Sequence, residues 1–470
     1  MRTQIPFHQT MITISKWKGT GIMGLVSDNV LYGTSISNSN YIATTFKPRI
    51  FFRDQHTGHS FAIDEPTVFK NLLLLGGAGS GKTNVLNQIV AQVRNWNSSE
   101  NQDGISLIFD TKGDYINHRG FRKPGDYIIG NDRRFRDISV TWNLFDEILA
   151  DGQQPIDYES NAREIASILF KDRGSKSQPF FCNAARDIFT NIIIYFVRRH
   201  RDNPERWENA LNNYNLINFI LQNKPNEFVQ IFEIYPDMHG LISYLGDGNN
   251  NQALGVLGEL RSMIYDCFQG IFAQKPTASQ PSFSIRKAIR DKGGKAIFVL
   301  YDLSVGETMT PIYRLLVDLA LKEALSESSN GHTHIFLDEL KLLPKISHLE
   351  DALNFGRSKK VSVVAGIQSV EQIYSIYEKE VGQVILSGFG SIIALKTADF
   401  ESRDYVTKLF GTNFTAYRYQ SENNSPIDKE RDGNTVEQWH YRSLEKPGQA
   451  IVGLASQVAP FFFNFEEDLT

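Results

Sequence analysis

The sequence has few cysteines, no long apolar run and no leader pattern. Its two cysteines, Cys182 and Cys267, are too few and too isolated for a disulfide framework or a thiolate metal site. Its ten histidines show no ligand spacing. No segment reaches the roughly 18 continuous apolar residues of a membrane-spanning helix, and residues 1–6 lack the charged-then-apolar pattern of a signal peptide. We therefore expect a soluble, reduced, cytoplasmic chain.

The chain also lacks an excess of charge of either sign. Its formal net charge is −4 at pH 7, which excludes a uniformly basic nucleic-acid coat but allows a local basic channel inside an assembly. At 470 residues the chain exceeds the usual size of one domain, so two or three structural units are expected. Apolar residues make up 41% of the sequence, enough for a large core.

The patterns along the chain predict an α/β protein with a mainly parallel sheet. Residues 1–65 contain short alternating runs, such as Met11–Ile14 and Tyr41–Thr44, and predict a β-rich N-terminal segment. Buried-strand signals then alternate with helical patterns, as in a parallel sheet covered on both faces. The strand signals lie at 71–75, 105–109, 296–300, 333–337, 362–366 and 391–395.

Two further segments depart from this alternation. Strand signals disappear from about 158 to 265, which predicts an all-helical domain, residues 151–279, inserted into a nucleotide-binding domain of residues 66–150 and 280–470. Between Ser421 and Thr435 the sequence is polar and charged, with Pro426 and Gly433, and predicts an exposed loop.

A phosphate-binding loop stands between a predicted strand and a predicted helix. Its residues are Gly76, Gly77, Ala78, Gly79, Ser80, Gly81, Lys82 and Thr83. The glycines let backbone N–H groups turn toward phosphates, and the following helix presents its positive N-terminus. Lys82 is expected to reach the β- and γ-phosphates and Thr83 to coordinate Mg²⁺. The cofactors predicted are ATP and Mg²⁺; the alternative is a chance glycine-rich turn.

Two adjacent acids, Asp338 and Glu339, end another buried strand. Hydrolysis at a phosphate loop needs one acid for the metal shell and a base that orients water, so we expect Asp338 beside Mg²⁺ and Glu339 as the catalytic base. Alternatively, Asp338 caps the strand end and Glu339 starts a helix. Asp110 and Asp302 also follow apolar strands, but neither has a paired acid.

The stretch from Asp338 to Gly411 resembles the type IV secretion coupling proteins, the TraD-like and TraG-like conjugative ATPases of the FtsK–HerA superfamily. The residues that carry the resemblance are 337–344 (LDELKLLP), 352–357 (ALNFGR), 364–369 (VAGIQS), 374–377 (YSIY) and 386–389 (LSGF). Upstream pieces at 110–114 (DTKGD), 141–147 (TWNLFDE) and 179–186 (PFFCNAAR) extend it, so the resemblance covers about residues 70–411.

The resemblance implies a RecA-like core with an inserted helical domain, assembled as a ring, usually a hexamer, that moves DNA with ATP. It implies that Arg357 is an arginine finger reaching a neighbouring subunit's ATP, and that Gln368 senses the γ-phosphate. Typical members carry N-terminal transmembrane helices, which this sequence lacks. We therefore expect a soluble member, recruited to the inner face of the cell membrane by partners such as a relaxase or secretion-channel proteins.

Two basic clusters are the predicted contacts to the DNA backbone, without base readout. One cluster consists of Lys112, Arg119, Arg122, Lys123, Arg133, Arg134 and Arg136, with several aspartates among them. The other is Lys341 and Lys345, just past the acid pair. The alternative for both is ordinary solvated surface. Trp17 could stack on a base or pack in the N-terminal segment.

Three functions remain open from the sequence. The first is an ATP-driven DNA translocase of the coupling-protein type. The second is a soluble FtsK–HerA-type motor in DNA processing or defence. The third is a nucleotide-dependent scaffold that recruits a relaxase or protein substrate and hydrolyses ATP slowly.

Overall fold

The computed structural model describes most of the chain, and the statements below refer to the described residues. These are 22–37, 47–54, 58–99, 103–118, 121–173, 179–207, 209–246, 248, 250–304, 306–421 and 426–467. The runs Met11–Ile14 and Tyr41–Thr44, Trp17 and Arg119 lie outside them.

A mainly parallel sheet forms the centre of the molecule. Among the described residues it has nine strands in the order β16-β15-β12-β4-β11-β10-β5-β9-β6. The parallel strands are β4 (Leu72–Leu75), β5 (Gly104–Asp110), β6 (Tyr127–Gly130), β9 (Ala296–Leu300), β10 (His332–Leu337), β11 (Val361–Ile367) and β12 (Ser391–Leu395). Two antiparallel strands, β15 (Gln449–Gly453) and β16 (Phe461–Asn464), close one edge. The predicted α/β class with a mainly parallel sheet is confirmed.

Helices cover both faces of this sheet, which explains why its central strands are buried along their whole length. Leu73 and Leu75 of β4 enter one core, whereas Leu72 and Leu74 enter the other, because successive side chains of a strand point to opposite faces. The helices around the sheet are α1 (Glu65–Val68), α2 (Lys82–Ser99), α3 (Asp114–Asn117), α12 (Ile285–Asp291), α13 (Gly306–Leu325), α14 (Leu349–Phe355), α15 (Val370–Tyr377), α16 (Lys379–Ser387) and α17 (Phe400–Phe410).

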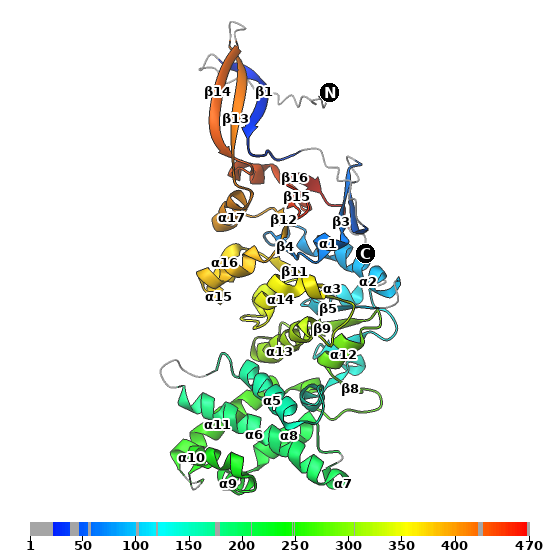
Figure 1. Ribbon diagram of the computed structural model, residues 1–470, viewed down its shortest axis with the longest axis vertical. Coiled ribbons are helices and arrows are strands. Elements are labelled where there is room, and N and C mark those ends of the chain that lie inside the picture. The colour runs from blue at the N-terminus through cyan, green and yellow to red at the C-terminus, as the bar shows by residue number, and fades with distance from the viewer. Residues whose placement is uncertain are drawn as a thin grey trace.

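A small antiparallel sheet projects from one end of the molecule (Figure 1). It consists of β1 (Ile22–Tyr32), β13 (Thr412–Ser421) and β14 (Pro426–Asn434), with β13 in the middle. The exposed loop predicted for 421–435 is therefore wrong over β14. This strand is solvent-exposed and alternates in charge, with Asp428 paired to Arg418 on β13, so it carries no apolar alternation. A separate hairpin, β2 (Pro48–Arg53) with β3 (Ser60–Asp64), packs beside α2.

The opposite end of the molecule is helical (Figure 1). Its helices are α5 (Pro155–Leu169), α6 (Phe180–Asp202), α7 (Pro204–Trp207), α8 (Asn213–Gln222), α9 (Pro225–Phe232), α10 (Ile242–Leu245) and α11 (Asn251–Cys267). Of the helices described, α6 passes a test of length and apolarity for crossing a membrane, but 67% of its most apolar window is buried inside the protein. α6 is therefore a core helix of the helical region.

The chain enters the helical region through β7 (Thr141–Trp142) and α4 (Leu144–Ile148), and returns through β8 (Ser282–Phe283) and α12. The carboxylate of Glu147 on α4 is fully buried at this junction. It accepts hydrogen bonds from Trp142 Nε1 at 2.9 Å and from the backbone N of Ile285 at 2.6 Å. Burial raises the pKa of Glu147, and these hydrogen bonds, given partly by the first turn of α12, oppose that rise.

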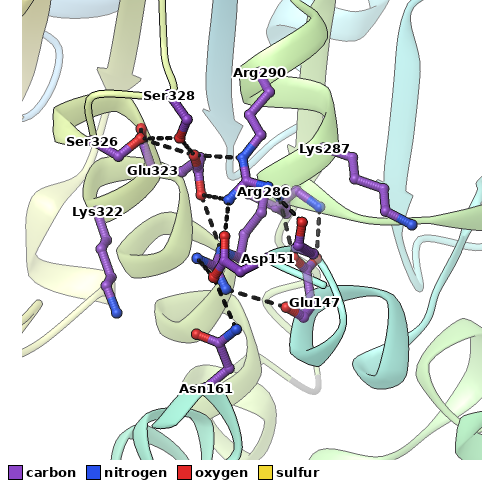
Figure 2. A network of polar contacts seen from close by, with 12 residues as sticks. Glu147, Asp151, Asn161, Arg286, Lys287, Arg290, Lys322, Glu323, Ser326 and Ser328 are labelled. Carbon is purple, nitrogen blue, oxygen red and sulfur yellow. Dashed lines mark hydrogen bonds and ion pairs between the residues drawn. The ribbon is translucent and has the colours of Figure 1, made fainter. Parts of the chain in front are cut away.

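Two arginines of α12 extend this junction (Figure 2). Arg286 pairs with Asp151 at 2.6 Å and with Glu323 of α13 at 3.1 Å. Arg290 binds the same two acids, with Glu323 at 2.7 Å. Because Glu323 and Arg286 are almost completely buried, these ion pairs tie α12 and α13 of the core to the start of the helical region.

Replacing Arg286 should destabilise the protein strongly, because a buried carboxylate loses its partner. We expect Arg286→Met to lower the free energy of unfolding by about 3 kcal/mol. The matched control is Arg163→Met, since Arg163 is 66% exposed and pairs with Glu159 one helical turn away; it should change stability by less than about 0.5 kcal/mol. Urea unfolding followed by circular dichroism measures both, and equal midpoints for the two variants would contradict a stabilising junction.

Candidate nucleotide site

The phosphate loop joins β4 to α2 at the carboxyl edge of the sheet. Backbone hydrogen bonds fix its start, from Gly76 N to Ile367 O of β11 and from Gly77 N to Lys396 O after β12. Gly79 and Gly81 have positive φ angles of 71° and 102°, which residues with a Cβ adopt only with strain. A Cβ added at Gly79 would meet nothing within 4 Å. The loop is therefore open on that side, as a phosphate cradle requires.

The Lys82 side chain is buried and lies back on its own loop. Its ammonium donates to Gly76 O at 2.5 Å and to Gly77 O at 3.1 Å. Burial lowers the pKa of Lys82, and the carboxylates of Glu339 and Asp338 oppose that fall. The cation is thus held by the glycine carbonyls and is stabilised by the charges of the two nearby acids.

The acid pair follows β10, two strands from β4. The Thr83 hydroxyl donates to Asp338 Oδ2 at 3.4 Å. Asp338 is 8% exposed, and burial raises its pKa to about 6, while the ammonium groups of Lys112 and Lys82 oppose the rise. A threonine hydroxyl beside a carboxylate is the oxygen set that binds Mg²⁺ together with substrate phosphates.

Glu339 and Gln368 form a second pair beside the first. Gln368 follows β11, and its Nε2 donates to Glu339 Oε2 at 2.7 Å. The other carboxylate oxygen, Oε1, is buried without a hydrogen-bond partner among the described residues. A buried acceptor left in this state is costly, and it is available to a water or hydroxyl that enters the site.

Two contributors to this site were missed by the sequence interpretation. One is Lys112, assigned only to a DNA cluster, whose charge lies close enough to lower the pKa of Asp338. Its turn is held by Asp110, which accepts five backbone N–H groups from residues 112–116. Asp110 therefore has a structural explanation, and the DTKGD turn was the signal that could have placed Lys112.

The other missed contributor is the C-terminal part of the chain. Gly448 N donates to Ser80 O at 2.9 Å, and Asn84 and Gln88 of α2 donate to Glu466 O at 2.6 and 2.8 Å. A Cβ on Gly81 would lie 2.8 Å from Gly448 N. No local motif marks these residues, because the contacts join positions more than 360 apart in sequence.

Arg357 lies apart from the rest of the predicted site. It belongs to a 3₁₀ turn, η5 (Gly356–Lys359), that precedes β11, whereas the phosphate loop follows the neighbouring parallel strand β4. The seven residues of β11 span about 23 Å, so Arg357 is at the opposite edge of the sheet from Lys82. Its side chain is exposed, and no ion pair to it is found among the described residues.

Three of the six described members of the first basic cluster have side-chain partners within the protein. Lys123 donates to Ser98 Oγ at the end of α2, Arg134 pairs with Asp132, and Arg136 donates to Asn131 O. In the second cluster Lys345 binds Asp172 at 3.2 Å, whereas Lys341 is exposed.

Gly448 offers a test of the C-terminal contact to the phosphate loop. Its φ is +85°, and a Cβ there would lie 2.9 Å from Phe465 O, so Gly448→Ala should shift the loop and weaken Mg²⁺-ATP binding about tenfold. Gly411→Ala is the control, since Gly411 has φ +73° and nothing within 4 Å of its added Cβ. Titration calorimetry measures both, and equal affinities would show that the contact does not support the loop.

Comparisons with known proteins place this sequence among coupling proteins. Two curated relatives are coupling protein TraD of Escherichia coli (strain K12), 23% identical over 66% of this chain, and VirD4 of Agrobacterium fabrum, 25% identical over 54%. The chain spans 39% and 37% of their respective lengths.

Solved structures show the same fold. The unbound conjugative coupling protein TrwBdeltaN70 aligns with a TM-score of 0.68 and 18% identity, covering 96% of each chain. TrwB in complex with ADP and Mg²⁺ aligns with a TM-score of 0.65, 18% identity and 97% coverage of each chain. Residues 59–444 match the family model of the type IV secretion-system coupling protein DNA-binding domain. This match covers most of the sequence, and the chain therefore belongs to the type IV secretion coupling protein family.

Proposed function

We propose that this protein is an ATP-hydrolysing DNA translocase that works as a ring in conjugative transfer. The observation that carries the proposal is the split of the site: Lys82, Thr83, Asp338, Glu339 and Gln368 converge at one edge of the sheet, whereas Arg357 lies at the other. The nucleotide-bound TrwB structures, with ADP and Mg²⁺ or with an ATP analogue, support Mg²⁺-nucleotide as the ligand.

The site residues suit phosphoryl transfer to water. Lys82 would exchange its glycine carbonyls for phosphate oxygens, which a point charge on a flexible stem allows. Thr83 and Asp338 would hold Mg²⁺, whose charge neutralises the phosphates. Glu339 would orient the attacking water with its unpaired Oε1, and Gln368, already bonded to Oε2, would report nucleotide state to α15, which begins two residues later.

Arg357 would complete the site of a neighbouring subunit. A guanidinium stabilises charge spread over the transferring phosphoryl group. Because Arg357 is exposed and lies at the edge of the sheet away from its own phosphate loop, its proposed catalytic role is in another subunit's site. Hydrolysis then requires assembly, which supports a closed ring, with a hexamer as the expected form.

We propose different roles for the two domains. Residues 66–150 and 280–470 would form the motor domain, and residues 151–279 an inserted domain that meets the substrate. The family model, described as a DNA-binding domain, supports DNA held through its backbone. Relaxase or secretion-channel proteins at the inner face of the membrane would be the partners that direct it.

Hydrolysis should depend on the acid pair and respond to DNA. We expect Glu339→Gln to lower kcat about a hundredfold or more while ATP binding persists, and Lys82→Ala to lose both activity and binding. Removal of Mg²⁺ should stop turnover. A coupled assay with and without single- or double-stranded DNA measures these effects. DNA should raise the ATP turnover of a translocase. If saturating DNA leaves turnover unchanged, the result would favour the scaffold function and contradict the translocase.

The position of Arg357 predicts complementation between subunits. Arg357→Ala alone should reduce turnover about a thousandfold while an isolated subunit still binds ATP. Mixing Arg357→Ala with Glu339→Gln subunits should restore part of the activity, because some interfaces then pair an intact Glu339 with an intact Arg357. Mixtures as inactive as either parent, or loss of ATP binding by the monomeric Arg357→Ala protein, would show that Arg357 does not act in trans.

A further inference from the structure

A cavity of about 390 Å³ lies where the helical region meets the motor core. It opens between the end of α5, the first turns of α6 and the segment after the acid pair. The lining residues are Ser167, Ile168, Phe170, Lys171, Arg173, Pro179, Cys182, Asn183, Arg186 and Ser347. It is separate from the nucleotide site, since it contains none of the residues assigned there.

The charged side chains that line this cavity are all cationic among the residues that the structure describes. Lys171, Arg173 and Arg186 line it, and no carboxylate does among the residues that the structure describes. Acids lie behind this lining: Arg173 binds Asp266 through Nη2, and Arg186 binds its chain neighbour Asp187 at 3.2 Å. Burial lowers the pKa of Lys171, and the nearby carboxylates of Asp318 and Asp172 oppose that fall.

The donors around the cavity exceed the acceptors that the protein offers them. Arg173 Nε is buried without a hydrogen-bond partner in the described chain. The Arg186 side chain is 38% exposed, and its only ion pair in the described part of the protein is to its chain neighbour Asp187, which also accepts from the Tyr244 hydroxyl at 3.2 Å. The Asn183 amide and the Ser167 hydroxyl add further donors at the wall. A ligand with several acceptor oxygens and a negative charge satisfies such a set.

One wall of the cavity belongs to the segment that follows the catalytic acids. Lys171 Nζ donates to Lys345 O at 2.8 Å and to Ser347 Oγ at 2.9 Å. The backbone N of Ser347 in turn donates to Asp318 of α13 at 3.1 Å. Ile346 N donates to the Tyr377 hydroxyl at 3.1 Å.

These contacts connect the cavity to the hydrolytic residues by short lengths of chain. The segment 344–348 begins five residues after Glu339, and Tyr377 ends the helix that begins just after Gln368. A ligand that draws Lys171 away from Ser347 therefore loosens the support of a segment joined covalently to the base.

We propose that this cavity binds a phosphate group of the DNA backbone and that its occupancy is transmitted through Lys171 to the acid pair. The inference rests on the proposed function and assigns a DNA contact outside the two basic clusters. Guanidinium groups bind phosphate oxygens in pairs, and a volume of about 390 Å³ accommodates a phosphodiester with part of its sugars. Free phosphate has the same chemistry, so the experiment must separate the two sources.

Arg186 is the residue for this test, because its only ion pair in the described part of the chain is to its neighbour. Loss of one phosphate contact should weaken DNA binding by Arg186→Gln about tenfold and reduce the slope of log affinity against log salt by about one. Arg201→Gln is the matched control: Arg201 lies on the same helix and pairs with its neighbour Asp202 at 3.7 Å, away from the cavity. It should keep both affinity and slope.

Fluorescence anisotropy of a labelled oligonucleotide, from 50 to 300 mM salt, measures these quantities on the full chain with a non-hydrolysable ATP analogue. Arg186→Lys keeps the charge, so it should retain the salt slope while its affinity for DNA falls. This variant separates the loss of charge from a folding defect in Arg186→Gln. Thermal unfolding midpoints check that all three variants fold. If Arg186→Gln and Arg201→Gln show the same salt slope, the inference about the cavity is wrong, while the proposed function is unaffected. If the unmutated protein does not bind DNA, the proposed function itself is wrong.

Inorganic phosphate distinguishes the two sources of the ligand. If the cavity serves the DNA backbone, millimolar phosphate at constant ionic strength leaves oligonucleotide affinity unchanged within about twofold. A site for free phosphate would instead bind phosphate in a calorimetric titration that Arg186→Gln abolishes, with no effect of this variant on DNA binding. That pattern would overturn the assignment to DNA.

Discussion

The alignment of three parallel strands is the constraint on which this structure depends. β4, β11 and β10 are neighbours in register, so Gly76, Gln368 and Asp338, each following one of these strands, meet at one edge of the sheet. Backbone pairing places them, and side-chain contacts refine them: Thr83 bonds to Asp338, and Gln368 bonds to Glu339. The same register places Arg357, which precedes β11, at the far edge, and that separation makes a neighbouring subunit part of the proposed mechanism.

The proposed motor needs a connection from this edge to the helical end of the molecule, and the structure offers two. One is the ion-pair junction of Glu147, Arg286 and Glu323, which is buried and therefore stiff. The other is the segment 344–348, which donates to the buried Asp318 through Ser347 N and His348 N and accepts from Lys171 on its exposed side. A buried network resists rearrangement because each unpaired charge is costly. The hydrogen bonds of Lys171 are exposed and exchange cheaply with water or ligand, which makes Lys171 the part of the second connection best placed for transmission.

The sequence carries no local pattern for a segment whose structure depends on contacts with residues far away in the chain. The residues of β14 are charged and exposed and show no apolar alternation, so the sequence predicts a loop there. β14 is a strand because it pairs with β13, which in turn pairs with β1 some 390 residues earlier. The sequence groups Lys112 with basic surface residues, because a sequence does not show where a charged side chain points. In the structure Asp110 holds its turn beside Asp338.

By itself the sequence determined the chemistry of the nucleotide site and the class of fold, because glycine spacing, strand-end acids and apolar periodicity are local properties that need no partner. The motif residues from Gly76 to Thr83, with Asp338 and Glu339, were identifiable on those grounds. Only the tertiary structure decided how they meet and what else joins them: the C-terminal contact of Gly448 on Ser80, the distance of Arg357 from its own phosphate loop, and the cationic cavity at Arg186. Each of these depends on which strands and helices become neighbours, and residues hundreds of positions apart carry no local record of that choice.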